Sequence, residues 1–187
     1  RRVLVSTDDA EIAAIAREHG AEAPFLRHAA ADDMAPSSEA TLAALEQAEA
    51  HWGERYEYVS QLMANCPLRG AAEIRDAVGG FLQRGADFQI SCFRFGWMNP
   101  WWAARLDEAQ RPDYLFPEAR KARSQDLPPL YCPSGAIWVA RSEALKGSRS
   151  FHGEGCTLHP MNWMAAMDID DHDDLEMARA CSLVLMK

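Results

Sequence analysis

The sequence predicts an α/β protein built around a mostly parallel sheet. Short apolar runs that are typical of strands alternate with segments of helical spacing along most of the chain. Polar clusters follow several of the apolar runs, at the positions where such sheets bind ligands. A length of 187 residues suits one domain that can bury a real core. We therefore expect a single domain over residues 1–187, without internal repeats or linkers.

The first half of the chain is expected to alternate strand and helix. Val3 to Val5 is apolar and β-branched, and Asp8 stands three residues before Glu11, as in an acidic capping box. Apolar side chains then recur at helical spacing up to Gly20. The expected elements are a strand at 3–5, a helix ending near 20, an extended piece at 25–26, a loop at 28–36, a helix starting at Ser37 or Ser38, and a strand at 56–63.

The second half continues the alternation around one irregular stretch. A turn over 64–69 leads into a helix that Gly85 closes. Residues 94–128 are rich in Trp, Pro and Arg and predict a long irregular excursion. The remaining expected elements are strands at 87–93, 134–140 and 165–169 and a terminal helix at 171–185.

Composition excludes several classes of function. The formal net charge is -9, which argues against a broad nucleic-acid-binding surface. The sequence contains no run of 18 or more apolar residues, so no membrane-spanning helix is expected. The five cysteines are scattered and form neither a zinc spacing nor an obvious disulfide framework. A reducing cytoplasm is the expected location.

The densest polar cluster is the acidic run over 168–174. If its first residues are extended, Asp168 and Asp170 point to one side and together suit Mg2+. The alternative is that these are charges stabilised by a helix N-terminus, which is the preferred interpretation for Asp173 and Asp174. An EF-hand is a poor match because its loop needs glycine where Asp173 stands.

Basic side chains also gather inside irregular segments of this acidic chain. Arg120, Lys121 and Arg123 lie in one loop, and Arg27 and Arg69 each end a strand-to-loop segment. Arginine binds carboxylate and phosphate through paired hydrogen bonds, so a site for an anionic ligand is one interpretation. A solvated loop is the other.

The aromatic stretch over 93–102 is too irregular for an amphipathic helix. It predicts a subunit interface or a sugar platform, with plain core packing as the alternative. The sequence contains no Walker A, G-x-G-x-x-G, G-x-S-x-G, H-E-x-x-H or C-x-x-C motif. Cys66 has no histidine near it in sequence and is interpreted as structural rather than nucleophilic.

Six motifs occur in order along the chain: Val5-Ser6-Thr7-Asp8, Arg27 with the segment to Ser37, Cys66-Pro67-Leu68-Arg69, Arg123-Ser124-Gln125-Asp126-Leu127-Pro128, Ser134-Gly135-Ala136-Ile137-Trp138 and Asp168-Ile169-Asp170. Together they resemble one family, the acylneuraminate cytidylyltransferases or CMP-sialic acid synthetases. The resemblance implies a three-layer α/β/α, Rossmann-like nucleotidyltransferase fold. It also implies transfer of CMP from CTP to a 2-keto acidic sugar, with Mg2+ as cofactor and pyrophosphate as product.

The resemblance implies roles for particular side chains. Asp168 and Asp170 match the family's metal-binding pair, and Arg123 is the remaining basic residue of a catalytic motif. The implied cytidine contacts are Arg27, Ala35 and Ser37. The implied sugar contacts are Met63, Asn65, Arg69, Gln125, Trp138 and Phe151. The excursion near 94–118 lies where the family extends a segment into its partner, which implies a homodimer.

The chain departs from the family pattern in its sugar motifs. Met63 replaces a glutamine, Ser124 replaces the second arginine of R-R-Q-D-L-P, Ser134 replaces an asparagine, and Trp138 replaces a tyrosine. These changes predict a nonulosonic acid, or another acidic sugar, in place of ordinary sialic acid.

The chain also starts after the family's Gly-, Arg- and Lys-rich phosphate loop, so an N-terminally incomplete domain is expected. A truncated, catalytically inactive nucleotide- or sugar-binding relative is therefore the alternative function. A pure assembly protein is a third hypothesis.

Overall fold

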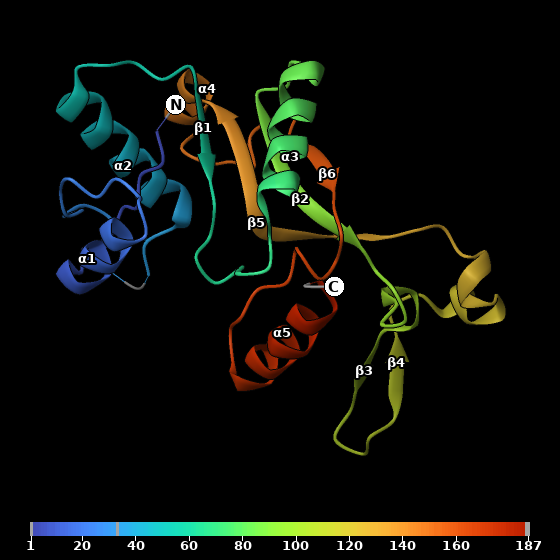
Figure 1. The fold of residues 1–187 in the computed structure, drawn as a ribbon. Coiled ribbons are helices and arrows are strands. Elements are labelled where there is room, and N and C mark those ends of the chain that lie inside the picture. Colours follow the sequence, from blue (N-terminus) through green and yellow to red (C-terminus); the bar gives the residue numbers. More distant parts are fainter. Residues whose placement is uncertain (1, 33, 186–187) are drawn as a thin grey trace. The chain divides into compact units, whose positions relative to one another are not determined.

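The computed structural model describes residues 2–32 and 34–185 of the chain (Figure 1). It divides into two compact units, which are described one at a time. Unit 1 comprises Arg1–Gln61, Arg84–Gln89 and Trp138–Thr157. Unit 2 comprises Leu62–Gln83, Ile90–Ile137 and Leu158–Lys187. The main sheet has the strand order β1-β5-β2-β6, and residues of β2 and β5 belong to both units.

Unit 1 contains helices α1 (Ala10–Glu18), α2 (Ser37–Trp52) and α4 (Ser142–Ser148) and strand β1 (Tyr58–Gln61). Asp9, not Asp8, caps α1, since its Oδ1 accepts the main-chain N–H groups of Glu11 at 2.7 Å and Ile12 at 3.0 Å. Gly53 ends α2 in the left-handed conformation, with φ of 65°.

The core of unit 1 forms where α2 and α4 supply apolar side chains. β1 pairs antiparallel with the end of β5 (Tyr131–Arg141), from Tyr58 opposite Arg141 to Gln61 opposite Trp138. The buried apolar side chains include Leu42, Leu45, Val139, Leu145 and Phe151. Burial of such side chains is the main favourable contribution to folding.

Unit 2 contains α3 (Ala71–Arg84), β2 (Phe88–Arg94), β6 (Thr157–Pro160) and α5 (His172–Leu185), apart from the few end residues that lie in unit 1. Gly85 follows α3 with φ of 65°, as its predicted stop requires. Buried side chains on α3, β2 and β5 include Phe81, Ile90 and Ile137. Among the described helices, none combines the length and the apolarity needed to cross a lipid bilayer.

The excursion over 94–128 is less irregular than expected. It holds an antiparallel hairpin of β3 (Ala104–Leu106) and β4 (Pro112–Tyr114) and three short 3-10 turns (Figure 1). The Phe95 N–H donates to the Leu130 carbonyl at 3.0 Å and closes the base of the excursion. The chain therefore enters β5 from this excursion and not from a crossover helix.

The α/β class is confirmed, but the sheet is mixed. β5 runs antiparallel to β1, which corrects the expectation of a mostly parallel sheet at this pair. An apolar run indicates that a strand is buried but does not show the direction of its neighbour, so the sequence pattern left this direction undetermined.

Two short strands predicted from apolar runs, at 3–5 and 165–169, are absent as strands among the described residues. At 3–5 only Leu4 forms a bridge, parallel to Glu22, and the predicted extended piece at 25–26 belongs to no strand. The run at 165–169 begins as a turn, because the Ala166 N–H donates locally to the Asn162 carbonyl at 3.0 Å. Local hydrogen bonds satisfy the main chain there in place of a sheet ladder.

Candidate functional site

The loop over 62–70 in unit 2 is held by a half-buried arginine. Arg69 Nη1 donates to the main-chain carbonyls of Met63 at 2.6 Å and Cys66 at 2.9 Å. Burial lowers the pKa of Arg69 from its usual value, while contact with Cys66 opposes that shift. Arg69 thus shapes the turn that presents Met63 and Asn65, whatever else it binds.

Asn65 connects this loop to the acidic segment that precedes α5. Its carbonyl accepts the Ile169 N–H at 2.9 Å, and its side-chain amide donates to Asp170 Oδ1 at 3.3 Å. One residue therefore bonds both the main chain and a side chain of the acidic segment. The structure brings Asn65 and Asp170, both predicted site residues, into direct contact.

The later aspartates of the acidic run cap α5. Asp171 Oδ1 accepts the N–H groups of Asp173 at 2.8 Å and Asp174 at 3.0 Å. Asp174 Oδ2 in turn accepts the N–H groups of Asp170 and Asp171. This reciprocal arrangement is a capping box, and it agrees with the predicted helix-terminal role of Asp174. Asp173 lies in the first turn of α5, as predicted.

The side chains of Asp168 and Asp170 are exposed and take no part in this capping box, although the Asp170 main-chain N–H donates to Asp174. Among the described residues, no group of three or more His, Cys, Asp or Glu side chains could hold a metal ion by itself. Mg2+ is commonly held by one or two carboxylates together with substrate phosphates. Two exposed carboxylates with hard oxygen donors fit that ion, and the substrate would supply further ligands.

Cys66 is buried beside this acidic segment. Burial raises the pKa of its thiol to about 11, and the negative charges of Asp168 and Asp170 add to the effect while Arg69 opposes it. A protonated, buried thiol is a poor nucleophile, which supports the structural interpretation of Cys66. All five cysteines are free thiols.

The raised pKa of Cys66 makes a prediction about alkaline unfolding. An unfolded thiol ionises near its ordinary value of 9.0, whereas the folded thiol ionises near 11. The unfolded state therefore binds fewer protons between these pH values, and the free energy of unfolding falls as pH rises through them. Urea titrations from pH 8 to 11 should show a shallower fall for Cys66→Ala than for the wild type. Parallel slopes in the two proteins would contradict the assignment.

Met63 packs directly on Gly135 of β5. A Cβ at Gly135 would lie 2.3 Å from Met63 Sδ, closer than any real contact. The glycine in the Ser134-Gly135-Ala136 motif therefore leaves room for the Met63 thioether. Ser134 is buried behind this contact, where its carbonyl accepts from Ser91 Oγ at 3.0 Å.

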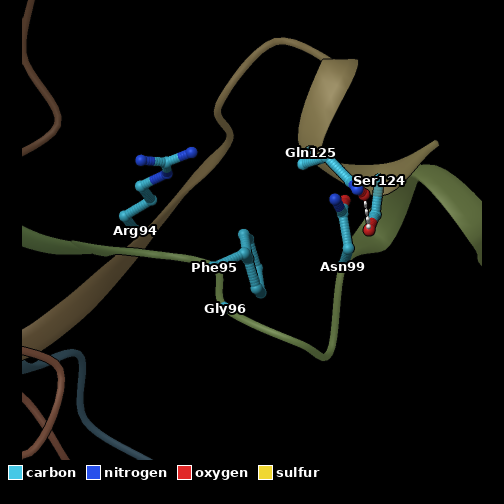
Figure 2. Close-up of a pocket in the computed structure, with 6 residues that line it drawn as sticks. All are labelled: Arg94, Phe95, Gly96, Asn99, Ser124 and Gln125. Carbon is cyan, nitrogen blue, oxygen red and sulfur yellow. Dashed lines mark hydrogen bonds between the residues drawn. The ribbon is translucent and has the colours of Figure 1, made fainter.

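Two predicted site residues lie at the 3-10 turn Ser124–Asp126 in unit 2: Arg123 directly precedes the turn, and Gln125 lies within it. Arg123 is exposed and forms a two-point ion pair with Asp126, at 2.7 Å and 3.1 Å. Gln125 lines a pocket of about 360 Å³ with Ser124, Arg94, Phe95, Gly96 and Asn99 (Figure 2).

Trp138 and Phe151 lie together in unit 1. The Trp138 ring meets Phe151 at 5.3 Å and His152 at 5.4 Å between centroids, both edge to face. Phe151 is fully buried and Trp138 only partly. Of these two predicted sugar contacts, Trp138 is the one with exposed surface, and Phe151 packs behind it.

The predicted cytidine contacts are also in unit 1. The Arg27 side chain donates from Nη1 to the main-chain carbonyls of Ala29 and Ala30. The Arg27 main-chain N–H donates to the Thr7 carbonyl at 2.8 Å. Ala35 lies just before α2, and Ser37 is its first residue. Arg27 therefore helps fold the loop in which Ala35 stands.

Within unit 2, Asn65 contacts Asp170 directly, and Arg69 and the Cys66 N–H both bond the Met63 carbonyl in the same loop. The ion-pair partner of Arg123 is Asp126. Arg94, Phe95 and Asn99 fall in the stretch over 93–102 that was interpreted as a subunit interface or a sugar platform, but none of them was singled out as a site residue. They lie about thirty positions from Ser124 in sequence, and no local pattern indicates that the two segments share a pocket.

Comparison with known proteins gives a consistent set of relatives, although no protein-family model matches the chain. A pseudaminic acid cytidylyltransferase of Campylobacter jejuni is 30% identical over 179 residues, which is 95% of this chain and 76% of that protein. An N-acylneuraminate cytidylyltransferase of Streptococcus agalactiae is 26% identical over 92% of this chain and 40% of that protein.

A solved structure shares the fold. CMP:2-keto-3-deoxy-manno-octonic acid synthetase, complexed with CTP, matches with a TM-score of 0.62 at 13% identity. The match covers 100% of this chain and 81% of that one. This likeness confirms the predicted Rossmann-like nucleotidyltransferase fold class.

Proposed function

The chain belongs to the acylneuraminate cytidylyltransferase family and is therefore a CTP-dependent nucleotidyltransferase, and we propose that its acceptor is a nonulosonic acid other than N-acetylneuraminate. The observation that carries this proposal is the 30% identity to a pseudaminic acid cytidylyltransferase across 95% of the chain. The altered sugar motifs support the choice of acceptor. In the proposed reaction an acceptor oxygen bonds to the α-phosphorus of CTP, and the bond from that phosphorus to the pyrophosphate leaving group breaks.

Asp168 and Asp170 are proposed to hold Mg2+, which would offset the negative charge of the reacting phosphates. Asn65 orients Asp170 through its 3.3 Å amide contact and anchors the neighbouring main chain through Ile169. This double attachment supports a fixed position for the Asp170 carboxylate. A fixed carboxylate costs little reorganisation when the substrate binds.

Arg27, Ala35 and Ser37 are proposed to bind the cytidine. The folded-back Arg27 side chain stabilises its own loop, which supports a defined position for Ala35. Arg123 is proposed to act at the phosphates, and its ion pair with Asp126 holds its guanidinium in one orientation until a more highly charged phosphate competes for it.

The proposed sugar contacts are Met63, Asn65, Arg69, Gln125, Trp138 and Phe151. Of these, Met63 and Trp138 replace polar or smaller residues of the family pattern with large apolar surface. Apolar surface at either residue favours an acceptor with a less polar substituent, because it leaves an extra hydroxyl of the acceptor without a hydrogen-bond partner. This is the physical reason to expect an acceptor other than N-acetylneuraminate.

A panel of acceptors tests the proposal. Pyrophosphate release with CTP and Mg2+ would be measured with pseudaminic acid, N-acetylneuraminate and 2-keto-3-deoxy-manno-octonic acid. We expect kcat/KM for pseudaminic acid to exceed that for N-acetylneuraminate by about 10-fold or more. A preference for N-acetylneuraminate would refute the proposed acceptor. If none of these acceptors supports pyrophosphate release, that result would instead favour a non-catalytic relative.

Two further features remain proposals. The exposed apolar side chains Trp97, Met98, Trp102, Leu106 and Phe116 along the excursion support self-association as a homodimer. The five free thiols and the use of CTP support a cytoplasmic location.

A further inference from the structure

We propose that Arg94 binds the carboxylate of the acceptor sugar in the pocket that it shares with Ser124. This inference rests on the proposed function, because it names a specificity-determining residue for the same reaction. The pocket has a volume of about 360 Å³ and lies wholly within unit 2 (Figure 2). That volume falls in the range of small-molecule sites.

Arg94 has no ion-pair partner among the described residues, unlike Arg123, the residue before Ser124. It ends β2, is exposed, and makes no ion pair or side-chain hydrogen bond within residues 2–32 and 34–185. Arg123, by contrast, already holds Asp126 through two hydrogen bonds. In a chain with a net charge of -9, a cation without a carboxylate partner beside a pocket is available for an anionic ligand.

The residue at position 124 changes the charge of this pocket. Ser124 stands where the R-R-Q-D-L-P pattern has its second arginine, so the motif has lost one positive charge. Ser124 and Arg94 line the same pocket, from the 3-10 turn and from the end of β2 (Figure 2). Arg94, at the end of β2, can therefore supply the pocket with a positive charge that the motif lacks at position 124.

The other lining groups suit the rest of a sugar acid. Figure 2 shows Arg94 on one side of the pocket and Asn99, Ser124 and Gln125 gathered on the other. Ser124 Oγ donates to Gln125 Oε1 at 3.3 Å, and this hydrogen bond orients the side-chain amide of Gln125. Arginine recognises a planar carboxylate through two parallel hydrogen bonds, and hydroxyl and amide groups can bind sugar hydroxyls.

The test removes the positive charge at residue 94 and, in a second variant, places one at residue 124. In Arg94→Ala, the KM for the preferred acceptor should rise by about 10- to 100-fold, the usual cost of a lost charge-assisted hydrogen bond, while the KM for CTP stays within about 2-fold. The double variant Arg94→Ala with Ser124→Arg should recover part of the acceptor KM. Arg94→Lys keeps the positive charge but not the planar guanidinium, so its KM for the acceptor should lie between those of the wild type and Arg94→Ala.

Arg75→Ala is the matched control, because Arg75 is an exposed arginine on α3 outside the proposed site. Thermal melts of each variant report whether it is folded. An unchanged acceptor KM in a folded Arg94→Ala protein would overturn the inference. So would a rise in the KM for CTP alone, which would assign Arg94 to the triphosphate. If the wild type transfers CMP to no acceptor, the proposed function itself fails, and that result is distinguishable from either of these.

Discussion

Replacing Asp170 with asparagine is expected to lower kcat for CMP transfer by about 100-fold or more, because a metal site of two carboxylates would lose one of its two charges. The change should leave the fold intact. The side chain is exposed, and its contact with Asn65 is a single 3.3 Å hydrogen bond that an amide oxygen can still accept. Initial rates of pyrophosphate release over a range of Mg2+ concentrations would measure the effect.

Asp173→Asn is the matched control for this prediction. Asp173 is an exposed aspartate three positions away, in the first turn of α5, and its side chain is not part of the proposed site. We expect it to retain nearly wild-type rates. If Asp170→Asn and Asp173→Asn behave alike, the acidic run acts only through the helix terminus and the metal assignment is wrong.

Replacing Gly153 with alanine is expected to destabilise the protein by about 3 kcal/mol, near the upper end of the cost of overpacking a core. The added Cβ would lie 2.2 Å from Cε2 of Phe88, and other atoms of that ring lie within 2.8 Å. Phe88 is only 5% exposed, so the ring has little room to move. Urea denaturation with linear extrapolation would measure the change in the free energy of unfolding.

Gly147→Ala provides the opposite expectation in the same unit. Gly147 lies in α4, and a Cβ there would meet nothing within 4 Å. Alanine should be neutral or stabilising by about 0.5–1 kcal/mol, because it favours the helix and restricts the unfolded chain. Equal destabilisation by the two substitutions would show that the contact with Phe88 is not the cause.

The longer elements were predictable because their signals are local and periodic. α2, α3 and α5 lie close to the ranges expected from helical spacing and glycine stops. The strands at 87–93 and 134–140 were found within a few residues, as Phe88–Arg94 and Tyr131–Arg141. The strands predicted at 3–5 and 165–169 do not form, and β6 and α4 were not predicted. An apolar run of three to five residues does not show whether a neighbouring strand is available to pair with it.

The candidate site was predictable only in part. The acidic pair Asp168 and Asp170 stood out by spacing, and the ordered motifs were sufficient to recognise the family that the relatives confirm. The partners of these residues were not visible. The Asn65 contact with Asp170 joins positions 105 residues apart, and the capture of Arg123 by Asp126 depends on the local 3-10 turn.

The sequence by itself determined the α/β class, the family and the acidic pair, because composition, periodicity and the order of motifs can all be read without knowing which distant segments pack together. Only the tertiary structure decided that the sheet is mixed, that Gly135 makes room for Met63, and that Arg94 shares a pocket with Ser124. These features depend on which distant segments pack together. Such packing is set by the combined burial and hydrogen bonding of many residues, and no single segment of the sequence encodes it.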